Sequence, residues 1–335
     1  MSEPKFHHFV PVMHLKHFVG PTPPGQVWTY DADLDRAWSS VPEETGGQRD
    51  FYSIERDDGM MDTAVEKCLS TVESAAAPVY EALLRGNIPA KGTQERVDFA
   101  AFLALMFMRT PGMRRMIGEV LGRNIQIMGY AYGISDTAFE ALNRRAEADG
   151  GRKLNADERE RVRQTLIDPS GYALQLPKER TLPVLLNTAN GLVPVFHNMK
   201  WTLVEAAHGF FITSDNPVVK DVDPKSVSPF YGDGGFANKT IEVIFPMSPK
   251  RALMMTWRES FPDTATVPGD YAWRVNQALA ANSDRQLYAH IEDERLRKLS
   301  TEFKHTKPGM TTQGFGPEKF AKVDVPRRIG HPPTT

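Results

Sequence analysis

Residues 97–108 constrain the fold more than any other part of the sequence. Read as a helix, this segment is apolar on nearly every side, and Asp98 is its only charged residue. A helix of that kind must be covered by protein on all its faces. It is too short to cross a bilayer, which takes about 20 apolar residues. The rest of the chain must therefore supply layers that enclose a central helix.

Length and composition exclude several classes of protein. A chain of 335 residues forms one large domain or two closely packed ones, and it buries enough surface to need no disulfide or metal staple. The net charge of −2 argues against broad, non-specific nucleic-acid binding, although a local basic groove stays open. The single cysteine and an N-terminus without the apolar segment of a signal peptide predict a cytoplasmic protein. A secreted mini-protein, a membrane protein and a disordered chain are all excluded.

The hydrophobic period changes along the chain. Helical spacing predicts helices in the middle of the sequence, over residues 62–86, 93–108, 111–130 and 181–198, and Ser135 and Asn155 are expected to be the N-cap residues of two more amphipathic helices. Branched and aromatic residues then predict strands at residues 201–205, 209–213, 241–245 and 252–257, and two earlier strands are predicted at 27–31 and 51–54. This order predicts an α+β fold, with a helical middle and a smaller sheet built from the N-terminal and later strands. We expect one domain over residues 1–306, followed by a tail rich in Gly, Pro and Thr at 307–335.

Histidines are concentrated near the N-terminus, where four of nine fall within residues 7–17. His7 and His8 come just before Pro11, which suits the first turn of a short helix. The positive end of a helix lowers an imidazole pKa and suits anion binding, metal ligation or proton transfer. His14 and His17 share one helical face and could ligate a metal. The alternative for all four is a structural role, in capping or packing.

A second group of polar residues, Thr-Ser-Asp-Asn-Pro at 213–217, follows an apolar strand. Asp215 at a strand end can act as a base, a metal ligand or a partner that orients a histidine. Ser214 could act as a nucleophile, although no sharp nucleophile turn of the Gly-x-Ser-x-Gly kind surrounds it. The alternative is a turn in which Asp215 and Asn216 bond nearby backbone groups and Pro217 fixes the exit.

Arg109, at the end of the central apolar helix, has two interpretations. It can cap the helix carbonyls, or it can clamp an anionic group of a substrate through its fork of donors. Glu66 and Glu73 lie on one side of an earlier helix and could be paired metal carboxylates, but no Glu-x-x-His accompanies them. The sequence has no Walker loop, Gly-x-Gly-x-x-Gly or His-Glu-x-x-His motif.

These motifs also carry a family resemblance. The opening HHFVPVMHLKHF at residues 7–18, the VWTYD strand at 27–31, MRTP at 108–111, FITSDNP at 211–217 and FPMSP at 245–249 resemble the domain-of-unknown-function family 4238. The resemblance covers roughly residues 6–291, and the two-histidine opening and TSDNP are its most specific parts. Where the family usually has an aromatic residue and an Asn, this chain has His14 and His17, so neither is carried over as a site residue. The family name implies no activity, and the resemblance implies only the positions of the motifs.

The resulting prediction is an intracellular hydrolase acting through a His/Asp site. His7 and His8 would supply acid–base chemistry, and Asp215 would orient one of them. In an alternative role these three residues would hold a divalent metal. Hydrogen bonds and anion binding would come from Ser214, Asn216 and Arg109. A phosphodiester is the expected substrate, as in a phosphodiesterase or nuclease, so the expected partner is an anionic small molecule or nucleic acid, not a membrane.

The alternative prediction is a non-catalytic ligand-binding or interaction protein of a stress or defence system. One geometric expectation separates the two. An imidazole needs a partner that fixes its tautomer, and a buried carboxylate needs a donor. We therefore expect His7 or His8 to meet Asp215 in one pocket.

Overall fold

The computed structural model describes residues 6–52, 54–55, 61–62, 64–172, 174–228 and 234–304. Its helices are α1 (Val12–Leu15), α2 (Ala64–Leu84), α3 (Gln94–Met108), α4 (Pro111–Gly133), α5 (Asp136–Ala148), α6 (Ala156–Ile167), α7 (Lys178–Asn198), α8 (Gly269–Asn282) and α9 (Glu294–Glu302). Its strands are β1 (Phe6–His8), β2 (Gly20–Pro21), β3 (Pro24–Asp31), β4 (Arg36–Ser40), β5 (Gly47–Arg49), β6 (Ile54–Glu55), β7 (Met61–Asp62), β8 (Lys200–Ala206), β9 (Thr213–Ser214), β10 (Val219–Asp221), β11 (Glu242–Pro246), β12 (Arg251–Thr256), β13 (Thr264–Val267) and β14 (Gln286–Ala289). The predicted α+β class is confirmed, and the predicted tail at 307–335 lies outside the described residues.

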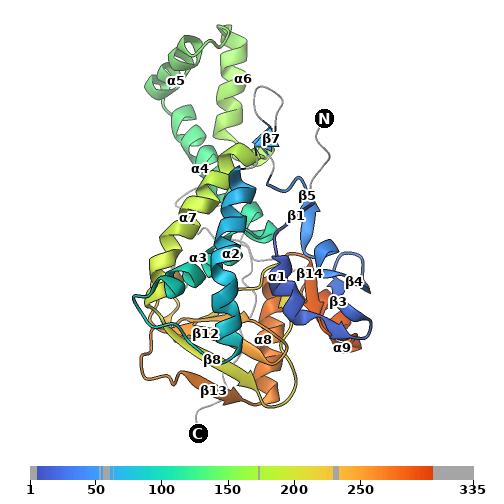
Figure 1. Cartoon of the computed structure of the whole chain (residues 1–335). Helices are drawn as coiled ribbons and strands as arrows, with labels where there is room; N and C mark the ends of the chain where they lie inside the picture. The colour runs from blue at the N-terminus through green and yellow to red at the C-terminus, as the bar shows by residue number, and fades with distance from the viewer. Residues whose placement is uncertain are drawn as a thin grey trace.

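Helix α3 lies in the core, as its sequence predicted, and both α2 and α7 pack against it (Figure 1). Thr93 caps its first turn by accepting a hydrogen bond from the Arg96 N–H. The Arg96 guanidinium is buried, lies over the Trp201 ring, and donates to the carbonyls of residues 89, 197 and 199. A charged side chain is thereby buried without an unpaired donor, and it fixes α3 to the end of α7 and the start of β8.

The larger sheet has the order β10-β11-β12-β8-β13 and is antiparallel except for β13, which runs parallel to β8. Side chains alternate between its two faces. In β12, Leu253 and Met255 join the core around α3, while Ala252 and Met254 join the core around α8. Helices therefore cover both faces of this sheet, with α3 on one side and α8 on the other.

The second sheet has the order β2-β3-β14-β9, with β4 also paired to β3. Leu287 of β14 stands opposite Tyr30 of β3 on one side and Ser214 of β9 on the other. The expected pairing of N-terminal and later strands is thus found here. The other later strands form the larger sheet by themselves.

The N-terminal segment differs from expectation. Helix α1 has only four residues, and Pro11 is its N-cap residue rather than its first helical residue. His7 and His8 lie in β1, which pairs with β5, so their position is set by a strand and not by the helix that follows. The N–H groups of Phe9 and Val10 both donate to the Gly46 carbonyl, and this continues the extended backbone up to Pro11. The predicted short helix is therefore present directly after Pro11, but the two histidines belong to the strand before it.

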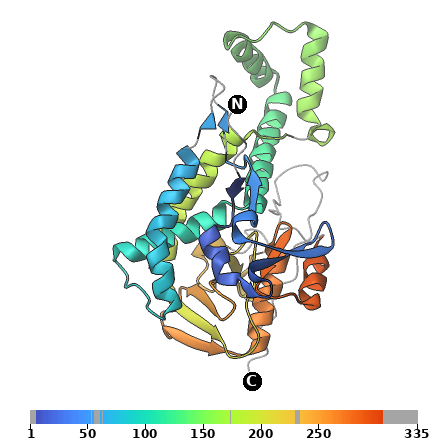
Figure 2. The ribbon, with the colours of Figure 1, turned by 45° about the vertical axis from the view of Figure 1, so that its right-hand side comes forward.

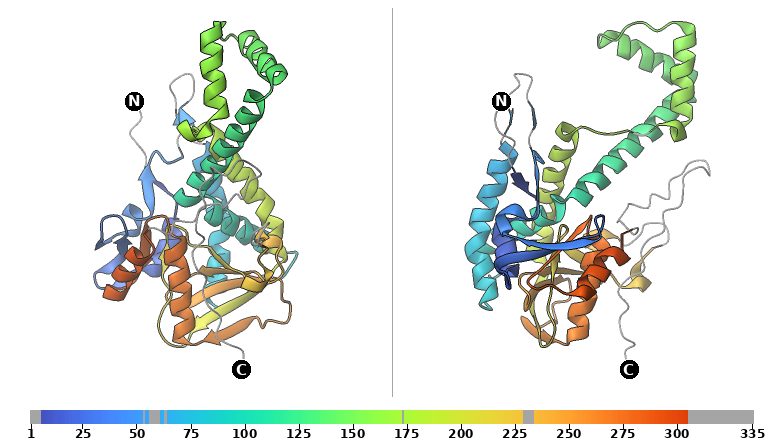
Figure 3. Two further views of the ribbon diagram at one scale, coloured as in Figure 1. Left: turned by 180° about the vertical axis from the view of Figure 1, so that it is seen from behind. Right: turned by 90° about the vertical axis from the view of Figure 1, so that its right-hand side faces the viewer.

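An arm of helices projects from the body of the protein, as Figures 1, 2 and 3 show. We define the arm as residues 122–172, which include the outer half of α4 together with α5 and α6. Gly129 and Gly133 of α4 allow α6 to approach closely, because a Cβ on Gly133 would lie 2.9 Å from Ile167. None of the helices in the described part of the chain combines the length and apolar character needed to cross a bilayer.

Candidate functional site

His7 is buried and held in one tautomer. Its Nδ1 accepts a hydrogen bond from the Tyr52 N–H at 3.0 Å, and its ring stacks on the Tyr52 ring. The proton of the neutral ring therefore sits on Nε2, which is buried without a hydrogen-bond partner and lies 3.8 Å from a carboxylate oxygen of Glu66. His7 is arranged to donate a hydrogen bond from Nε2, and it cannot accept a proton there.

His8 is held in the same tautomer by a different partner. Its Nε2 donates to the Glu43 carbonyl at 3.0 Å, so Nδ1 carries the lone pair. Burial lowers the pKa of His8, and Arg109 adds to that effect, while the Glu43 carbonyl and the charges of Glu73 and Glu43 oppose it. His8 is therefore neutral at pH 7 and able to take a proton at Nδ1.

Arg109 connects the histidine strand to the helices. Its Nε donates to the Phe9 carbonyl at 3.0 Å, and its Nη1 forms a 2.6 Å ion pair with Glu73 of α2. Arg109 is also the C-cap residue of α3, and its own carbonyl accepts the Tyr52 hydroxyl. Arg109 thus occupies the C-cap position through its backbone N–H, but its side chain donates to the Phe9 carbonyl and to Glu73 rather than to the last carbonyls of α3, as the capping interpretation required. Binding an anionic substrate would require Glu73 to leave the guanidinium.

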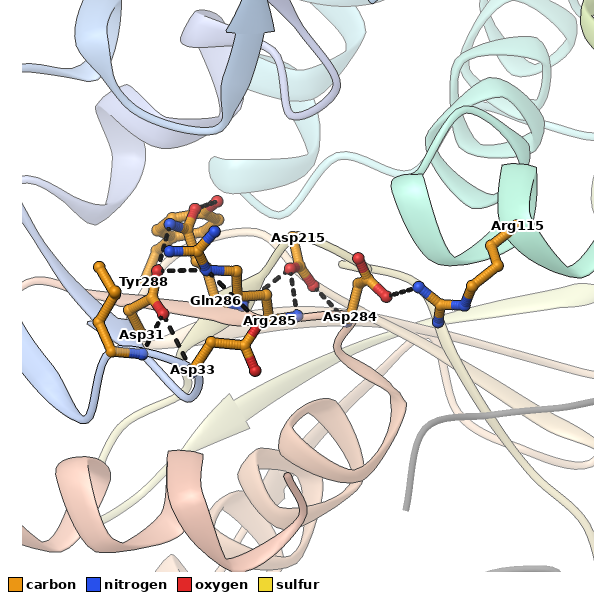
Figure 4. A network of polar contacts seen from close by, with 9 residues as sticks. Asp31, Asp33, Arg115, Asp215, Asp284, Arg285, Gln286 and Tyr288 are labelled. Atoms are coloured by element: carbon orange, nitrogen blue, oxygen red, sulfur yellow. Dashed lines mark hydrogen bonds and ion pairs between the residues drawn. The ribbon is translucent and has the colours of Figure 1, made fainter. Parts of the chain in front are cut away.

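Asp215 is buried and satisfied by backbone donors. Its Oδ1 accepts the Asp284 N–H at 2.8 Å, and its Oδ2 accepts the N–H groups of Arg285 and Gln286 at 2.7 and 2.8 Å. Burial raises the pKa of this carboxyl to about 7 against the opposing effect of the N–H donors. Figure 4 shows Asp215 facing this backbone segment, at the end of helix α8 and the start of β14.

The neighbours of Asp215 bond locally as well. The Ser214 hydroxyl donates to the Asn216 carbonyl and accepts the Asn216 N–H, and the Asn216 side chain donates to the Asn282 carbonyl. The turn that we gave as the alternative for TSDNP is found only in part, because Ser214 makes the local bonds while the Asp215 and Asn216 side chains bond to the distant backbone of residues 282–286. Among the described residues, no hydrogen bond or ion pair joins His7 or His8 to Asp215, and each of these three side chains has a hydrogen-bond partner elsewhere.

The turn is part of a longer polar network (Figure 4). The Arg285 side chain pairs with buried Asp31 of β3, and the Gln286 side chain donates to the same carboxylate. Burial opposes ionisation of Asp31, but the hydrogen bonds from Arg285 and Gln286 outweigh it and lower its pKa. At the other end, Asp284 pairs with Arg115 of α4. The network thus connects the second sheet to the base of the arm.

The two motif segments do meet, through residues that the prediction did not choose. The Tyr80 hydroxyl donates to the Met247 carbonyl at 2.7 Å, so it must accept from His14 Nδ1, which lies 2.8 Å away. His14 Nε2 then accepts the Thr213 hydroxyl at 2.8 Å. Burial lowers the pKa of His14 well below its usual value. A neutral imidazole therefore joins the N-terminal segment to TSDNP inside the core.

The described residues contain no group of three or more His, Cys, Asp or Glu side chains that could hold a metal ion. Glu66 lies near His7, and Glu73 is the partner of Arg109. The predicted metal role of His7, His8 and Asp215 therefore gains no geometric support from the described part of the chain.

A groove of about 360 Å³ opens between α3, α4 and α7. Its described lining residues are Phe107, Met108, Met113, Met116, Ile117, Val120, Leu121, Val184, Thr188, Leu192, Lys220 and Phe236. Among them only Lys220, from β10, carries a charge. Its ammonium lies 6.0 Å from the centre of the Phe236 ring.

A family model described as a protein of unknown function (DUF4238) matches residues 7–293. The chain belongs to the DUF4238 family. The resemblance drawn from its motifs is confirmed, and the match includes both motifs, the groove and the arm. No curated protein and no solved structure matches the chain.

Sequence reasoning missed two features of this DUF4238 chain. Packing was one of the roles considered for His14, and its burial agrees with that role, but its bond to Thr213 was not predicted. The groove was missed because its lining comes from separate helices. Methionines at 113 and 116 were the only local sign of an adaptable apolar surface.

Proposed function

We propose that this chain binds an elongated, mainly apolar small molecule that carries an acidic group, in the groove between α3, α4 and α7. The observation that carries the proposal is a wall of apolar side chains with one cationic residue beside it. Small-molecule sites have this composition, and volumes of about 300–1,000 Å³ are usual for them. Ligand binding in this groove also requires no catalytic group from His7-His8 or from residues 213–217. The side chains of those two motifs form hydrogen bonds within the fold.

The chemistry of the lining indicates the class of ligand. Met113 and Met116 give a flexible, polarisable surface that can fit chains or rings of different shape. Lys220 can pair with a carboxylate or sulfonate, while Phe236 contacts the adjoining apolar part. A medium-chain fatty acid represents this class. We place this function in the cytoplasm, where the exposed free thiol of Cys68 would remain reduced.

Filling the groove should abolish binding. We expect wild-type protein to bind anilinonaphthalene sulfonate with a rise in fluorescence, and decanoate to displace it. Val184→Trp places a large ring inside the groove and should weaken both ligands at least about tenfold, which is about 1.4 kcal/mol. Val41→Trp, at an exposed valine of the body that does not line the groove, is the matched control and should bind as wild type does. If the two variants bound the ligands equally well, the ligands would have to bind outside the groove.

The charge is tested separately with Lys220→Met. This variant should lose about tenfold in affinity for decanoate while keeping its affinity for decanol, because a hydrogen bond to a charged group contributes about 1.5–3 kcal/mol. Lys225→Met is the matched control, since Lys225 is exposed and does not line the groove. Parallel losses for the acid and the alcohol would rule out a role for Lys220 in recognising the acid.

A second candidate function is the predicted phosphodiester hydrolase, with His8 as its general base. It is favoured by one observation, the tautomer that leaves Nδ1 of His8 with its lone pair. Nucleic acid or a smaller phosphodiester is the substrate proposed under this candidate.

The hydrolase candidate predicts a specific pH profile. A base works when deprotonated, so the rate should rise with pH and level off below the usual histidine pKa of 6.5, because burial lowers the pKa of His8. The measurement is hydrolysis of bis(p-nitrophenyl) phosphate and of single-stranded DNA and RNA. His8→Gln should remove the activity, whereas His208→Gln, at an exposed site, should not. Activity that survives His8→Gln would reject this candidate.

A further inference from the structure

The arm carries most of the large apolar side chains that the described part of the chain exposes to solvent. On its helices these are Ile125, Ile127, Met128, Tyr132, Ile134 and Val162. Met128 and Ile134 are each 57 % exposed. Scattered single exposures are ordinary on a protein surface, but a cluster on one projecting element marks an interaction site. Figure 3 shows that the arm stands clear of the body.

The cluster has a defined face on α4. Ile125, Met128 and Tyr132 are spaced by three and four residues and so form one stripe along the helix. The glycine face is different, because Gly129 and Gly133 face Leu166 and Ile167 of α6. Residues 124–134 include no charged side chain. The outer half of α4 therefore has one side packed on α6 and one apolar side open.

The charges on the rest of the arm indicate what kind of partner it can meet. Residues 135–168 carry eight acidic and seven basic side chains in mixed order. Several already pair within the arm, including Arg159 with Glu140 and Glu147, and Arg163 with Asp136. Nucleic acid or an anionic membrane would be met by a basic surplus, which the arm lacks. Two copies of the arm, in contrast, can approach each other without net repulsion, because the charges of each arm are balanced.

We propose that two copies of this chain associate through their arms, with the stripe of Ile125, Met128 and Tyr132 on each α4 packed against the same stripe on its partner. Such a contact is isologous, with an apolar centre and a polar rim. It leaves the groove free, because the groove residues of α4 lie at positions 113–121, in its inner half. The proposal is therefore independent of ligand binding.

The test is sedimentation velocity of the full chain over a wide range of concentration. Wild-type protein should sediment as a dimer. Met128→Glu brings two carboxylates together across the interface, and we expect the dimer dissociation constant to rise about a hundredfold, since like charges in contact cost several kcal/mol. Leu34→Glu is the matched control at an exposed apolar residue of the body, and it should remain a dimer. Thermal unfolding of a monomeric Met128→Glu must match that of wild-type monomer, which separates lost association from lost folding.

A mixing experiment tests the symmetry. Met128→Lys alone should also be monomeric, and an equal mixture of Met128→Glu and Met128→Lys should recover the dimer, because the contact then pairs opposite charges. A wild-type chain that stays monomeric at every concentration would overturn the proposal, as would a dimer that Met128→Glu leaves intact. A monomer that pellets with phosphatidylcholine vesicles would overturn it in favour of a lipid surface.

Discussion

Replacing Asp215 by alanine is expected to destabilise the protein by about 4 kcal/mol or more, and so to remove much of its stability. Three backbone N–H groups donate to this carboxylate, and each loses its acceptor in the variant. An unpaired buried donor costs about 1–3 kcal/mol, against a total stability of about 5–15 kcal/mol. The measurement is urea unfolding followed by far-UV circular dichroism and tryptophan fluorescence.

Two further variants make this result specific. Asp215→Asn keeps one acceptor oxygen but points an amide N–H at a backbone donor. Its free energy of unfolding should therefore lie between those of Asp215→Ala and wild type. Asp149→Ala, at an exposed aspartate, should change stability by less than about 0.5 kcal/mol. A catalytic aspartate would behave differently, because its replacement removes activity and leaves the fold intact. Near-wild-type stability of Asp215→Ala would therefore restore the catalytic interpretation.

The second large effect is expected at His14. His14→Phe removes the acceptor of the buried Thr213 hydroxyl and the donor to Tyr80. We therefore expect the free energy of unfolding to fall by about 2–4 kcal/mol at pH 7.5. The control is His208→Phe at an exposed site, which should be close to neutral. A loss below about 0.5 kcal/mol would show that the connection does not support the fold.

The same residue predicts how stability changes with pH. Burial lowers the pKa of His14 in the folded state, so below the unfolded value of 6.5 the unfolded chain binds a proton that the folded chain does not. Stability should therefore fall as pH drops below 6.5, by up to about 1.4 kcal/mol per pH unit from this group. The difference between the wild-type and His14→Phe profiles isolates this contribution. Parallel profiles between pH 7.5 and 5.5 would contradict the lowered pKa.

Local signals explain which parts of the fold could be predicted. The cap at Thr93 and the apolar run at 97–108 specify a buried helix without reference to the rest of the chain. Ser135 and Asn155 likewise cap α5 and α6 as predicted, and Asn155 forms a full capping box with Glu158. These signals depend only on residues within one turn of each other, so they survive in the folded protein.

The rest depends on contacts between distant residues. Pro11 has the chemistry of a helix start, but pairing of β1 with β5 sets the backbone before it. The bond between His14 and Thr213 joins positions 199 residues apart, and nothing near either residue specifies the other. The glycines of α4 weaken a helix in isolation, and their role becomes clear only when α6 packs on them. Sequence reasoning located both motif segments, but it assigned their contact to the wrong side chains.

The pairing of β3 with β14 has a consequence for how the protein is made. Strand β3 ends at Asp31, and its partner residues begin at Gln286, so one edge of β3 lacks this partner until residues 286–289 have left the ribosome. Strand β4 can cover the other edge early, because it follows β3 directly. During synthesis the open edge, with Trp28 and Tyr30 among its residues, is a template for pairing with other nascent chains. The yield of correctly folded protein should therefore depend on a chaperone or another factor that covers this strand edge before residues 286–289 emerge.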